Sequence, residues 1–282
     1  MKNLAKPASL EGKVIAITGA GGVLCGEMAK ELGRCKAKVA VLDLSLEKAE
    51  EVAQSIRGEG GCAKAYSCNV LKEEDLKNTH QAINNDLGKI DILVNGAGGN
   101  SPKATTSEEY FQKVHEEGAI SFFDLQKEGV EFVFDLNFMG TFLPTKEFAT
   151  DMIGREGCSI LNVSSMNAFT PLTKIPAYSG AKAAVSNFTK WLAVHFSRIG
   201  IRVNAIAPGF LVTAQNKAML FDEAGNPTQR TEKILAATPM QRFGEADELL
   251  GALLFLLDEE ASSFITGVVL PIDGGFSSYS GV

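Results

Sequence analysis

The sequence predicts an α/β fold built on a doubly wound parallel sheet. Short, continuously apolar segments alternate with helical patterns along the chain, as expected for strands that are covered on both faces. Glycines follow the first apolar segment at once, and right-handed crossovers then place helices on both sides of the sheet. With 282 residues, 45% hydrophobic and 22% charged, the chain is expected to form a single domain spanning 1–282.

Each expected strand is a run of five to seven mainly apolar residues. In chain order they are 13–18, 38–42, 63–67, 90–95, 159–164, 201–207 and 268–272. Helical patterns fill the intervals, and Ser45 with Glu47 marks one helix start, as N-cap and first-turn acid. Two stretches are less regular. We interpret the stretch around 100–130 as an insertion and the stretch around 210–239 as a substrate loop.

Charge and composition exclude several classes of function. The net charge of −7 argues against nucleic acid or an anionic membrane as the main partner. No apolar stretch approaches the ~20 residues of a membrane span, and no signal peptide is evident, which favours the cytoplasm. Five cysteines without a C-x-x-C pair indicate a reducing compartment and no zinc site. There are only three histidines and no H-E-x-x-H motif, so a site for another transition metal is not expected either.

The glycine-rich segment after the first strand predicts a dinucleotide site. It opens a helix, whose free N–H groups and partial positive charge suit a pyrophosphate, while glycine lets the backbone approach closely. The alternative is that the segment is an ordinary tight turn. The position of the segment between a strand and a helix disfavours that alternative. The segment's expected cofactor contacts are Gly19, Gly21, Gly22, Val23 and Leu24.

Asp43 ends the second expected strand, 24 residues after Gly19. A carboxylate at this place can accept hydrogen bonds from the adenosine ribose and repels a 2′-phosphate. Leu44 follows it, where an arginine would favour NADP. These residues predict NAD as the cofactor in preference to NADP.

A second group of residues predicts proton transfer to or from an alcohol. Tyr178 and Lys182 are four residues apart and share one helix face, so the ammonium can favour the phenolate. Such a pair alone is commonly an exposed helix face. Here Ser165 follows the fifth expected strand and can hydrogen-bond the reacting oxygen. Asn137 can hold a water that links Lys182 to solvent.

Together these motifs resemble the short-chain dehydrogenase/reductase family, over about 10–277. Besides the residues above, the matching motifs are Asn95-Gly96-Ala97-Gly98, Arg202-Val203-Asn204, Pro208-Gly209 and Asp273-Gly274-Gly275. The resemblance implies one Rossmann-like domain with strand order 3-2-1-4-5-6-7, a nicotinamide cofactor, and an Asn137-Ser165-Tyr178-Lys182 tetrad. It also implies a homo-oligomer, tetramer or dimer. The further cofactor contacts it implies are Asn69 and Val70 at the adenine, Asn95, Gly96, Ala97 and Gly98 in the loop, and Pro208, Gly209 and Thr213 near the nicotinamide. Leu44, Tyr178 and Lys182 are expected cofactor contacts as well.

The sequence also departs from the family pattern. Val23 and Cys25 stand where the family's loop has glycines, and Asn69 and Gly96 replace a commoner Asp and Asn. The 42 residues between Asn95 and Asn137 exceed the family's usual spacing, and the excess falls in the insertion. The phenylalanine-rich insertion and the glycine-loop variant resemble the D-mannonate oxidoreductase (fructuronate reductase) branch. This resemblance implies reversible oxidation of D-mannonate to D-fructuronate with NAD.

A small-molecule sugar acid requires a cation and hydrogen-bonding groups in its site. Candidate contacts are Asn100 and Asn167, and candidate carboxylate partners are Lys103, Arg230 and Arg242, each of which could instead be an ordinary surface residue. Another sugar acid, a polyol of the gluconate 5-dehydrogenase kind or a 3-oxoacyl thioester stays open as substrate. A regulatory protein that senses NAD without chemistry is the alternative of another class, and the retained tetrad argues against it.

Overall fold

The computed structural model describes residues 10–112, 117–213, 220–222 and 225–281. Its seven strands form one parallel sheet in the order β3-β2-β1-β4-β5-β6-β7, which confirms the predicted fold class and strand order. The strands are β1 (Val14–Thr18), β2 (Lys38–Asp43), β3 (Cys62–Ser67), β4 (Ile92–Asn95), β5 (Cys158–Val163), β6 (Ile201–Pro208) and β7 (Val269–Ile272). The predicted fourth strand begins two residues too early, because Asp91 already caps the β1 backbone with its side chain.

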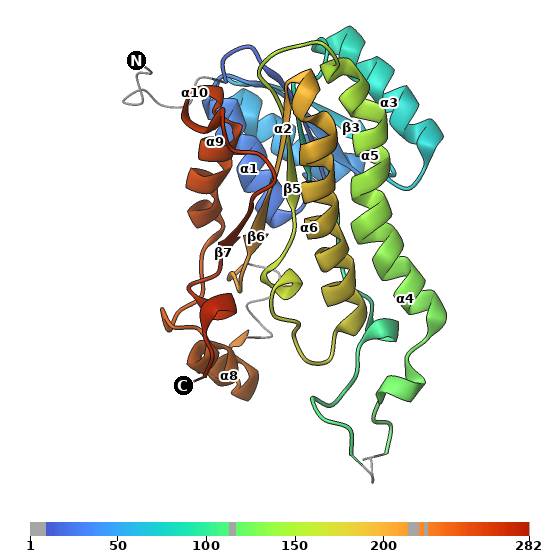
Figure 1. Cartoon of the computed structure of the whole chain (residues 1–282), viewed down its shortest axis with the longest axis vertical. Helices are drawn as coiled ribbons and strands as arrows, with labels where there is room; N and C mark the ends of the chain where they lie inside the picture. The colour runs from blue at the N-terminus through green and yellow to red at the C-terminus, as the bar shows by residue number, and fades with distance from the viewer. Residues whose placement is uncertain (1–9, 113–116, 214–219, 223–224, 282) are drawn as a thin grey trace.

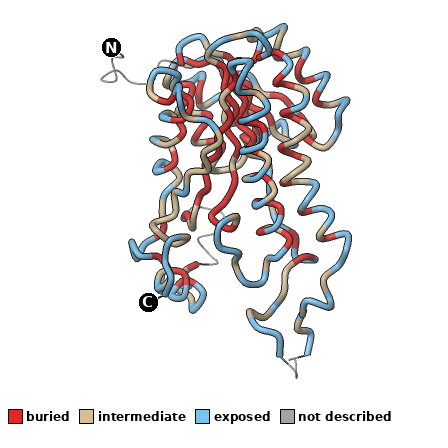
Figure 2. The backbone as a smooth tube through the Cα atoms, viewed as in Figure 1, coloured by how far each residue is buried: buried red, intermediate tan, exposed pale blue. Residues whose placement is uncertain are grey.

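Helices cover both faces of the sheet (Figure 1). One layer contains α1 (Val23–Arg34), α2 (Leu46–Gly58) and α9 (Leu250–Leu257), and the other contains α3 (Glu73–Asp86), α5 (Gly140–Phe148) and α6 (Pro176–Phe196). Successive residues of β1 alternate between the two layers: Ile15 and Ile17 pack in the first, Val14 and Ala16 in the second. β1 is therefore buried at all five positions, and Figure 2 shows the sheet at the buried centre of the molecule. No helix in the described ranges is long and apolar enough to cross a membrane.

The expected insertion extends beyond the sheet at the lower end of Figure 1. Its regular parts are two short 3-10 turns, η1 (Pro102–Ala104) and η2 (Phe122–Asp124), and then α4 (Lys127–Phe134). Residues 113–116 of the insertion lie outside the described residues. A small cluster holds its base: Ala104 and Val133 pack against Ala177 and Ala181 of α6. The insertion is thereby attached to the first turns of α6.

The expected substrate loop follows β6 and contains α8 (Gln229–Ala237). Thr228 caps this helix, because its hydroxyl accepts a hydrogen bond from the Thr231 amide. Residues 214–219 and 223–224 of the loop lie outside the described residues. In Figure 1, α8 lies at the same end of the molecule as the insertion, the end at which β5 and β6 finish.

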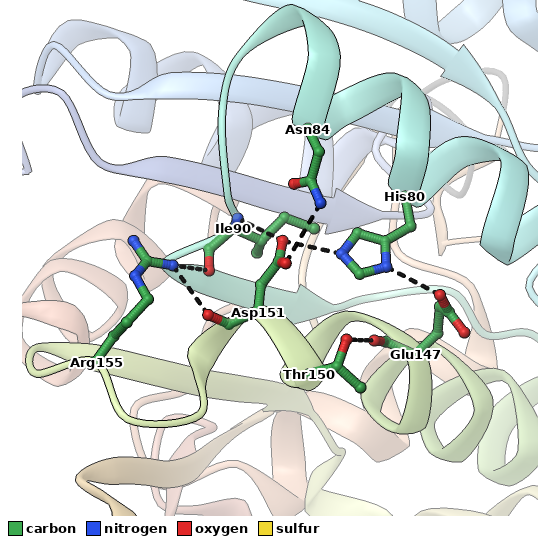
Figure 3. Close-up of polar contacts among 7 residues, drawn as sticks. All are labelled: His80, Asn84, Ile90, Glu147, Thr150, Asp151 and Arg155. Atoms are coloured by element: carbon green, nitrogen blue, oxygen red, sulfur yellow. Dashed lines mark hydrogen bonds and ion pairs between the residues drawn. The ribbon is translucent and has the colours of Figure 1, made fainter.

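A buried polar network fastens α3 to the segment after α5 (Figure 3). The two ring nitrogens of His80 lie 2.9 Å from carboxylate oxygens of Glu147 and Asp151. Asp151 also accepts hydrogen bonds from the Ile90 amide at 3.0 Å and from Asn84 at 3.3 Å. Burial by itself raises the pKa of Asp151, but these hydrogen bonds and His80 outweigh it and leave the pKa below its usual value.

We expect Asp151→Asn to lower the free energy of unfolding by about 2–3 kcal/mol at neutral pH, because a buried charged acceptor contributes more than a neutral one. A carboxyl whose pKa is lower in the folded than in the unfolded protein stabilises the fold at any pH above its unfolded-state pKa, which is about 4. This stabilisation is lost as the pH falls to the pKa of the folded state. The deficit should therefore shrink below about pH 4. Urea unfolding of both proteins at neutral and acid pH measures it. Glu73→Gln, which alters an exposed pair with Lys146, is the control. If Asp151→Asn lost as much free energy of unfolding in acid as at neutral pH, the charge of Asp151 would not be the source of the stabilisation.

Candidate active site

The glycine-rich segment and the loop after β4 line an open cavity of about 310 Å³. Gly19 has φ +66°, in the left-handed region that favours glycine, and a Cβ there would lie 2.9 Å from the Ala97 backbone. The Thr18 hydroxyl accepts hydrogen bonds from the amides of Gly96 and Ala97, at 3.0 and 3.3 Å. The cavity's lining includes most of the expected loop residues: Gly19, Gly21, Gly22, Val23, Leu24, Asp43, Gly96, Ala97 and Gly98.

Asp43 stands at the end of β2 on the edge of this cavity. Its two carboxylate oxygens accept hydrogen bonds from the amides of Gly21 and Ser45, both at 3.0 Å. A Cβ on Gly21 would crowd Asp43 and Lys48, so glycine is required for this contact. Leu44 is 72% exposed beside it. Lys48, in the first turn of α2, also lines the cavity. Lys48 was not among the expected cofactor residues, although its position one helical turn from the Ser45 N-cap could have indicated it.

The two departures at Cys25 and Gly96 compensate each other. A Cβ on Gly96 would overlap the Cys25 sulfur, so the Cys25 side chain fills the space that a side chain at 96 would need. Cys25 is buried, and burial raises the pKa of its thiol to about 12. Cys25 is therefore a neutral packing group, as a deprotonated thiolate would be needed for redox reactivity.

We expect Gly96→Asn to destabilise the protein by about 1–3 kcal/mol and to weaken NADH binding, because the new side chain overpacks against Cys25. The double variant Gly96→Asn with Cys25→Gly should regain most of the binding, with a small residual cost from glycine inside α1. Thermal unfolding and NADH fluorescence titration of the four proteins measure this coupling. A double variant as impaired as Gly96→Asn alone would show that the two positions are independent.

The other expected cofactor residues lie outside the lining of this cavity, and three of them stand at the ends of β3 and β4. Asn95 is buried, and its amide donates to Thr145 of α5 and to Asn162 of β5, each at 2.9 Å. The Asn95 side chain therefore stabilises the end of β4 and does not face a ligand. Asn69 and Val70 form the turn after β3: the Asn69 side chain accepts a hydrogen bond from the Leu71 amide, and Val70 packs against Gly140.

The next expected cofactor residues follow β6. Pro208 ends the strand, and the Gly209 amide donates to the Ile272 carbonyl at 2.9 Å. A Cβ on Gly209 would lie 2.5 Å from the Asp273 backbone. The segments that follow β6 and β7 can therefore approach this closely only with glycine at position 209. Thr213 lies four residues further on, at the last described position before the gap.

Tyr178 and Lys182 lie in the first two turns of α6, which begins at Pro176. The Lys182 ammonium lies 5.7 Å from the centre of the Tyr178 ring and donates a hydrogen bond to the Val163 carbonyl at 2.8 Å. Ser165, two residues after the end of β5, hydrogen-bonds the Tyr178 hydroxyl. A strand end and a helix start therefore bring the two hydroxyls and the ammonium together.

Asn137 joins this group from a turn of π-helix, η3 (Asp135–Met139), between α4 and α5. The side chain is fully buried, and its amide nitrogen donates to the carbonyls of Gly99 and Val133, both at 2.7 Å. A Cβ on Gly98 would lie 2.7 Å from the Asn137 side-chain oxygen and 3.2 Å from the Lys182 ammonium. Gly98, Asn137 and Lys182 are therefore neighbours, and the tetrad adjoins the glycine-lined cavity, because Gly98 also lines that cavity.

Burial dominates the ionisation of the two titratable residues. Burial raises the pKa of Tyr178, and the hydrogen bond from Ser165 offsets part of this rise. Burial also lowers the pKa of Lys182 to about 8. The net pKa shift of the phenol is therefore upward, whereas the sequence predicted a depression by Lys182. At neutral pH the site holds a protonated phenol beside an ammonium, and this arrangement can donate a proton to a developing alkoxide.

The expected substrate contacts have different surroundings. Asn167 is buried, and its side-chain oxygen has no hydrogen-bond partner within the described part of the chain. Asn100 is exposed and donates to the Thr105 hydroxyl at 3.1 Å. Arg242 makes two hydrogen bonds with the Glu248 carboxylate, at 2.7 and 2.6 Å, so its charge is already paired. Lys103 is exposed at the surface of the insertion, whereas Arg230 lines a second cavity. No group of His, Cys, Asp and Glu side chains among the described residues could hold a metal ion.

Comparisons with known proteins agree with this geometry. The model of the short chain dehydrogenase family matches residues 13–224. An uncharacterized oxidoreductase of Haemophilus influenzae is 62% identical over 280 residues, which cover 99% of this chain and 98% of the relative. A crystal structure, also from Haemophilus, of a protein named provisionally as a D-mannonate oxidoreductase contains bound NAD. It is 62% identical, with a TM-score of 0.95 and 98% coverage of both chains.

A more distant relative has a named activity. The 5-keto-D-gluconate 5-reductase of Escherichia coli is 32% identical over 267 residues, which cover 95% of this chain and 96% of that protein. The family model covers the glycine loop, the tetrad and strands β1 to β6, and the two relatives match nearly the whole chain. The chain belongs to the short-chain dehydrogenase family.

Proposed function

We propose that this protein is an NAD-dependent oxidoreductase that interconverts D-mannonate and D-fructuronate. The observation that carries the proposal is the meeting of Ser165, Tyr178, Lys182 and Asn137 beside a glycine-lined cavity that ends at Asp43. The bound NAD and the provisional name of the Haemophilus structure support the cofactor and the substrate. The E. coli relative supports a keto sugar acid as the substrate class.

The glycine-lined cavity fits the dinucleotide. Three of its positions would clash with neighbouring backbone or side chains if they carried a Cβ, namely Gly19, Gly21 and Gly96. Asp43 offers its carboxylate to the ribose hydroxyls, and the free amides at the start of α1 suit the pyrophosphate. Asn69, Val70, Pro208, Gly209 and Thr213 complete the proposed cofactor contacts, and Asn95 supports the loop from below. When bound, the nicotinamide supplies or accepts the hydride.

In the reductive direction the residues of this chain activate the carbonyl and supply the proton. The hydroxyls of Ser165 and Tyr178 donate hydrogen bonds to the substrate carbonyl oxygen, and they stabilise the negative charge that develops on it. Tyr178 then gives its proton to that oxygen, and the nearby Lys182 ammonium stabilises the phenolate left behind. Asn137 fixes the loop at Gly99, because its side chain accepts a hydrogen bond from the Gly99 amide and donates one to the Gly99 carbonyl. Asn167 accepts a hydrogen bond from a substrate hydroxyl with its unpartnered oxygen.

A second substrate has its own support. The E. coli relative reduces 5-keto-D-gluconate according to its name, so that keto acid is the main competitor of D-fructuronate. Nicotinamide absorbance during reduction of the two keto acids, with NADH, distinguishes them. We expect D-fructuronate to have the larger kcat/KM. A larger kcat/KM for 5-keto-D-gluconate would make that keto acid the substrate in place of D-fructuronate. If neither compound were turned over, a keto sugar acid would be refuted as the substrate.

A further inference from the structure

A second cavity, of about 370 Å³, lies between α8, the segment before α6, and the insertion. Two of its lining residues adjoin the candidate site along the chain. Ile175 is the residue before α6, three positions from Tyr178, and Phe210 follows Pro208 and Gly209. Glu109 lines the cavity from the insertion, and Arg230 lines it from the first turn of α8. The insertion therefore forms a wall of this cavity.

The lining of the cavity carries an excess of positive charge. Its cations are Lys174, Arg230 and Lys233, and its single carboxylate is Glu109. Lys233 and Glu109 pair at 3.0 Å, which neutralises both. The side chains of Lys174 and Arg230 have no ion pair or hydrogen bond with any residue in the described ranges. Two uncompensated cations facing one cavity predict an anionic ligand.

Local backbone structure holds both cations at the cavity. Lys174 has φ +72°, an uncommon conformation for a residue with a side chain, and its carbonyl accepts the Thr106 amide from the insertion at 2.9 Å. Arg230 lies in the first turn of α8, where the partial positive charge of the helix adds to its own. Phe210, Phe276 and Ile234 provide an apolar part of the lining, which strengthens charge interactions by reducing local water.

We propose that Arg230 and Lys174 bind the carboxylate of the sugar acid, with Arg230 as the bidentate partner. This inference rests on the proposed function, and it selects one of the three expected carboxylate partners. Arg242 is paired with Glu248, and Lys103 lies outside the lining of this cavity. The Glu109–Lys233 pair joins the insertion to α8 and keeps the wall of the subsite in place. The insertion and the substrate loop together then determine the preference for an acid over a neutral sugar.

The first test compares charged and uncharged substrates. We expect Arg230→Gln to raise KM for D-fructuronate by about 10- to 100-fold, with a smaller change in kcat. KM for NADH should stay unchanged, and so should any rate measured with D-fructose, which has no carboxylate. Lys174→Gln should have the same effect on a smaller scale. Lys190→Gln, an exposed cation on α6 outside the cavity, is the matched control and should resemble the wild type. Equal losses with D-fructuronate and D-fructose would refute carboxylate binding by Arg230.

A binding measurement separates this inference from the proposed function. The NADH complex is titrated with D-gluconate and with the neutral polyol D-sorbitol, and NADH fluorescence is followed. We expect the wild type to bind D-gluconate more tightly and Arg230→Gln to lose that preference. If the preference is lost but no keto sugar acid is reduced, the subsite stands and the proposed reaction is wrong. If keto acids are reduced but Arg230→Gln retains the preference, the reaction stands and the subsite is wrong.

Discussion

Replacing Tyr178 by phenylalanine should reduce kcat for keto acid reduction by about 10³-fold or more and leave the NADH dissociation constant unchanged. The phenol is the only proton donor that the proposed mechanism places on the substrate oxygen. Ser165 can polarise that oxygen, but the variant leaves no group positioned to protonate it as the hydride arrives. The ring itself is retained, so the packing at the start of α6 should persist.

Steady-state kinetics and fluorescence titration of NADH test this prediction side by side. Tyr66→Phe is the matched control, because it also removes one hydroxyl, the one that donates to Asp86 at 3.0 Å, on the far strand β3. That variant should lose some stability and keep its kcat. Turnover by Tyr178→Phe within tenfold of the wild type would show that Tyr178 is not the proton donor.

Replacing Asp43 by asparagine should reverse the cofactor preference or bring it close to parity. The carboxylate would lose its charge, so its hydrogen bonds to the ribose hydroxyls should weaken and its repulsion of a 2′-phosphate should disappear. The loss of one charged hydrogen bond predicts a rise in KM for NADH of about 10- to 100-fold. Lys48 lines the same cavity and can attract the 2′-phosphate once the repelling carboxylate charge is gone, so kcat/KM for NADPH should rise.

The pair of variants Asp43→Asn and Asp43→Asn with Lys48→Ala separates the two effects. Both should use NADH poorly, and only the first should gain activity with NADPH. The asparagine keeps one side-chain oxygen for the Ser45 amide, so the start of α2 should remain intact. An unchanged NADH/NADPH ratio in Asp43→Asn would show that another residue selects the cofactor.

The strands were predictable because their apolar residues are continuous and their ends carry turn residues. β1 is buried at all five positions, so its signal is the strongest of the sheet. β3 alternates exposed and buried residues at the edge of the sheet, which explains its weaker sequence signal. The strand order followed from the family resemblance rather than from any local pattern. The proximity of Ser165 to Tyr178 and Lys182 was predictable, because Ser165 follows a strand end and the other two share one helix face, whereas Asn137 lies on a π-helical turn whose place beside them no local pattern indicates.

Contacts between distant residues were not predictable. Nothing in the local sequence indicates that the Cys25 sulfur fills the space above Gly96, or that Arg242 is neutralised by Glu248. The Glu109–Lys233 pair spans 124 positions and exists only because the insertion folds toward α8. The pKa of Tyr178 was also misjudged, since the desolvation of the phenol depends on packing that the spacing of Tyr178 and Lys182 does not reveal.

Transfer of deuterium from labelled NADH tests the central claim most directly. The protein is incubated with D-fructuronate and NADH deuterated at both positions of C4, and the product is analysed by NMR and mass spectrometry. The account predicts D-mannonate that carries one deuterium at the former ketone carbon, and no such product from Tyr178→Phe. A product without deuterium, or no reduction of D-fructuronate while NADH binds, would contradict the account.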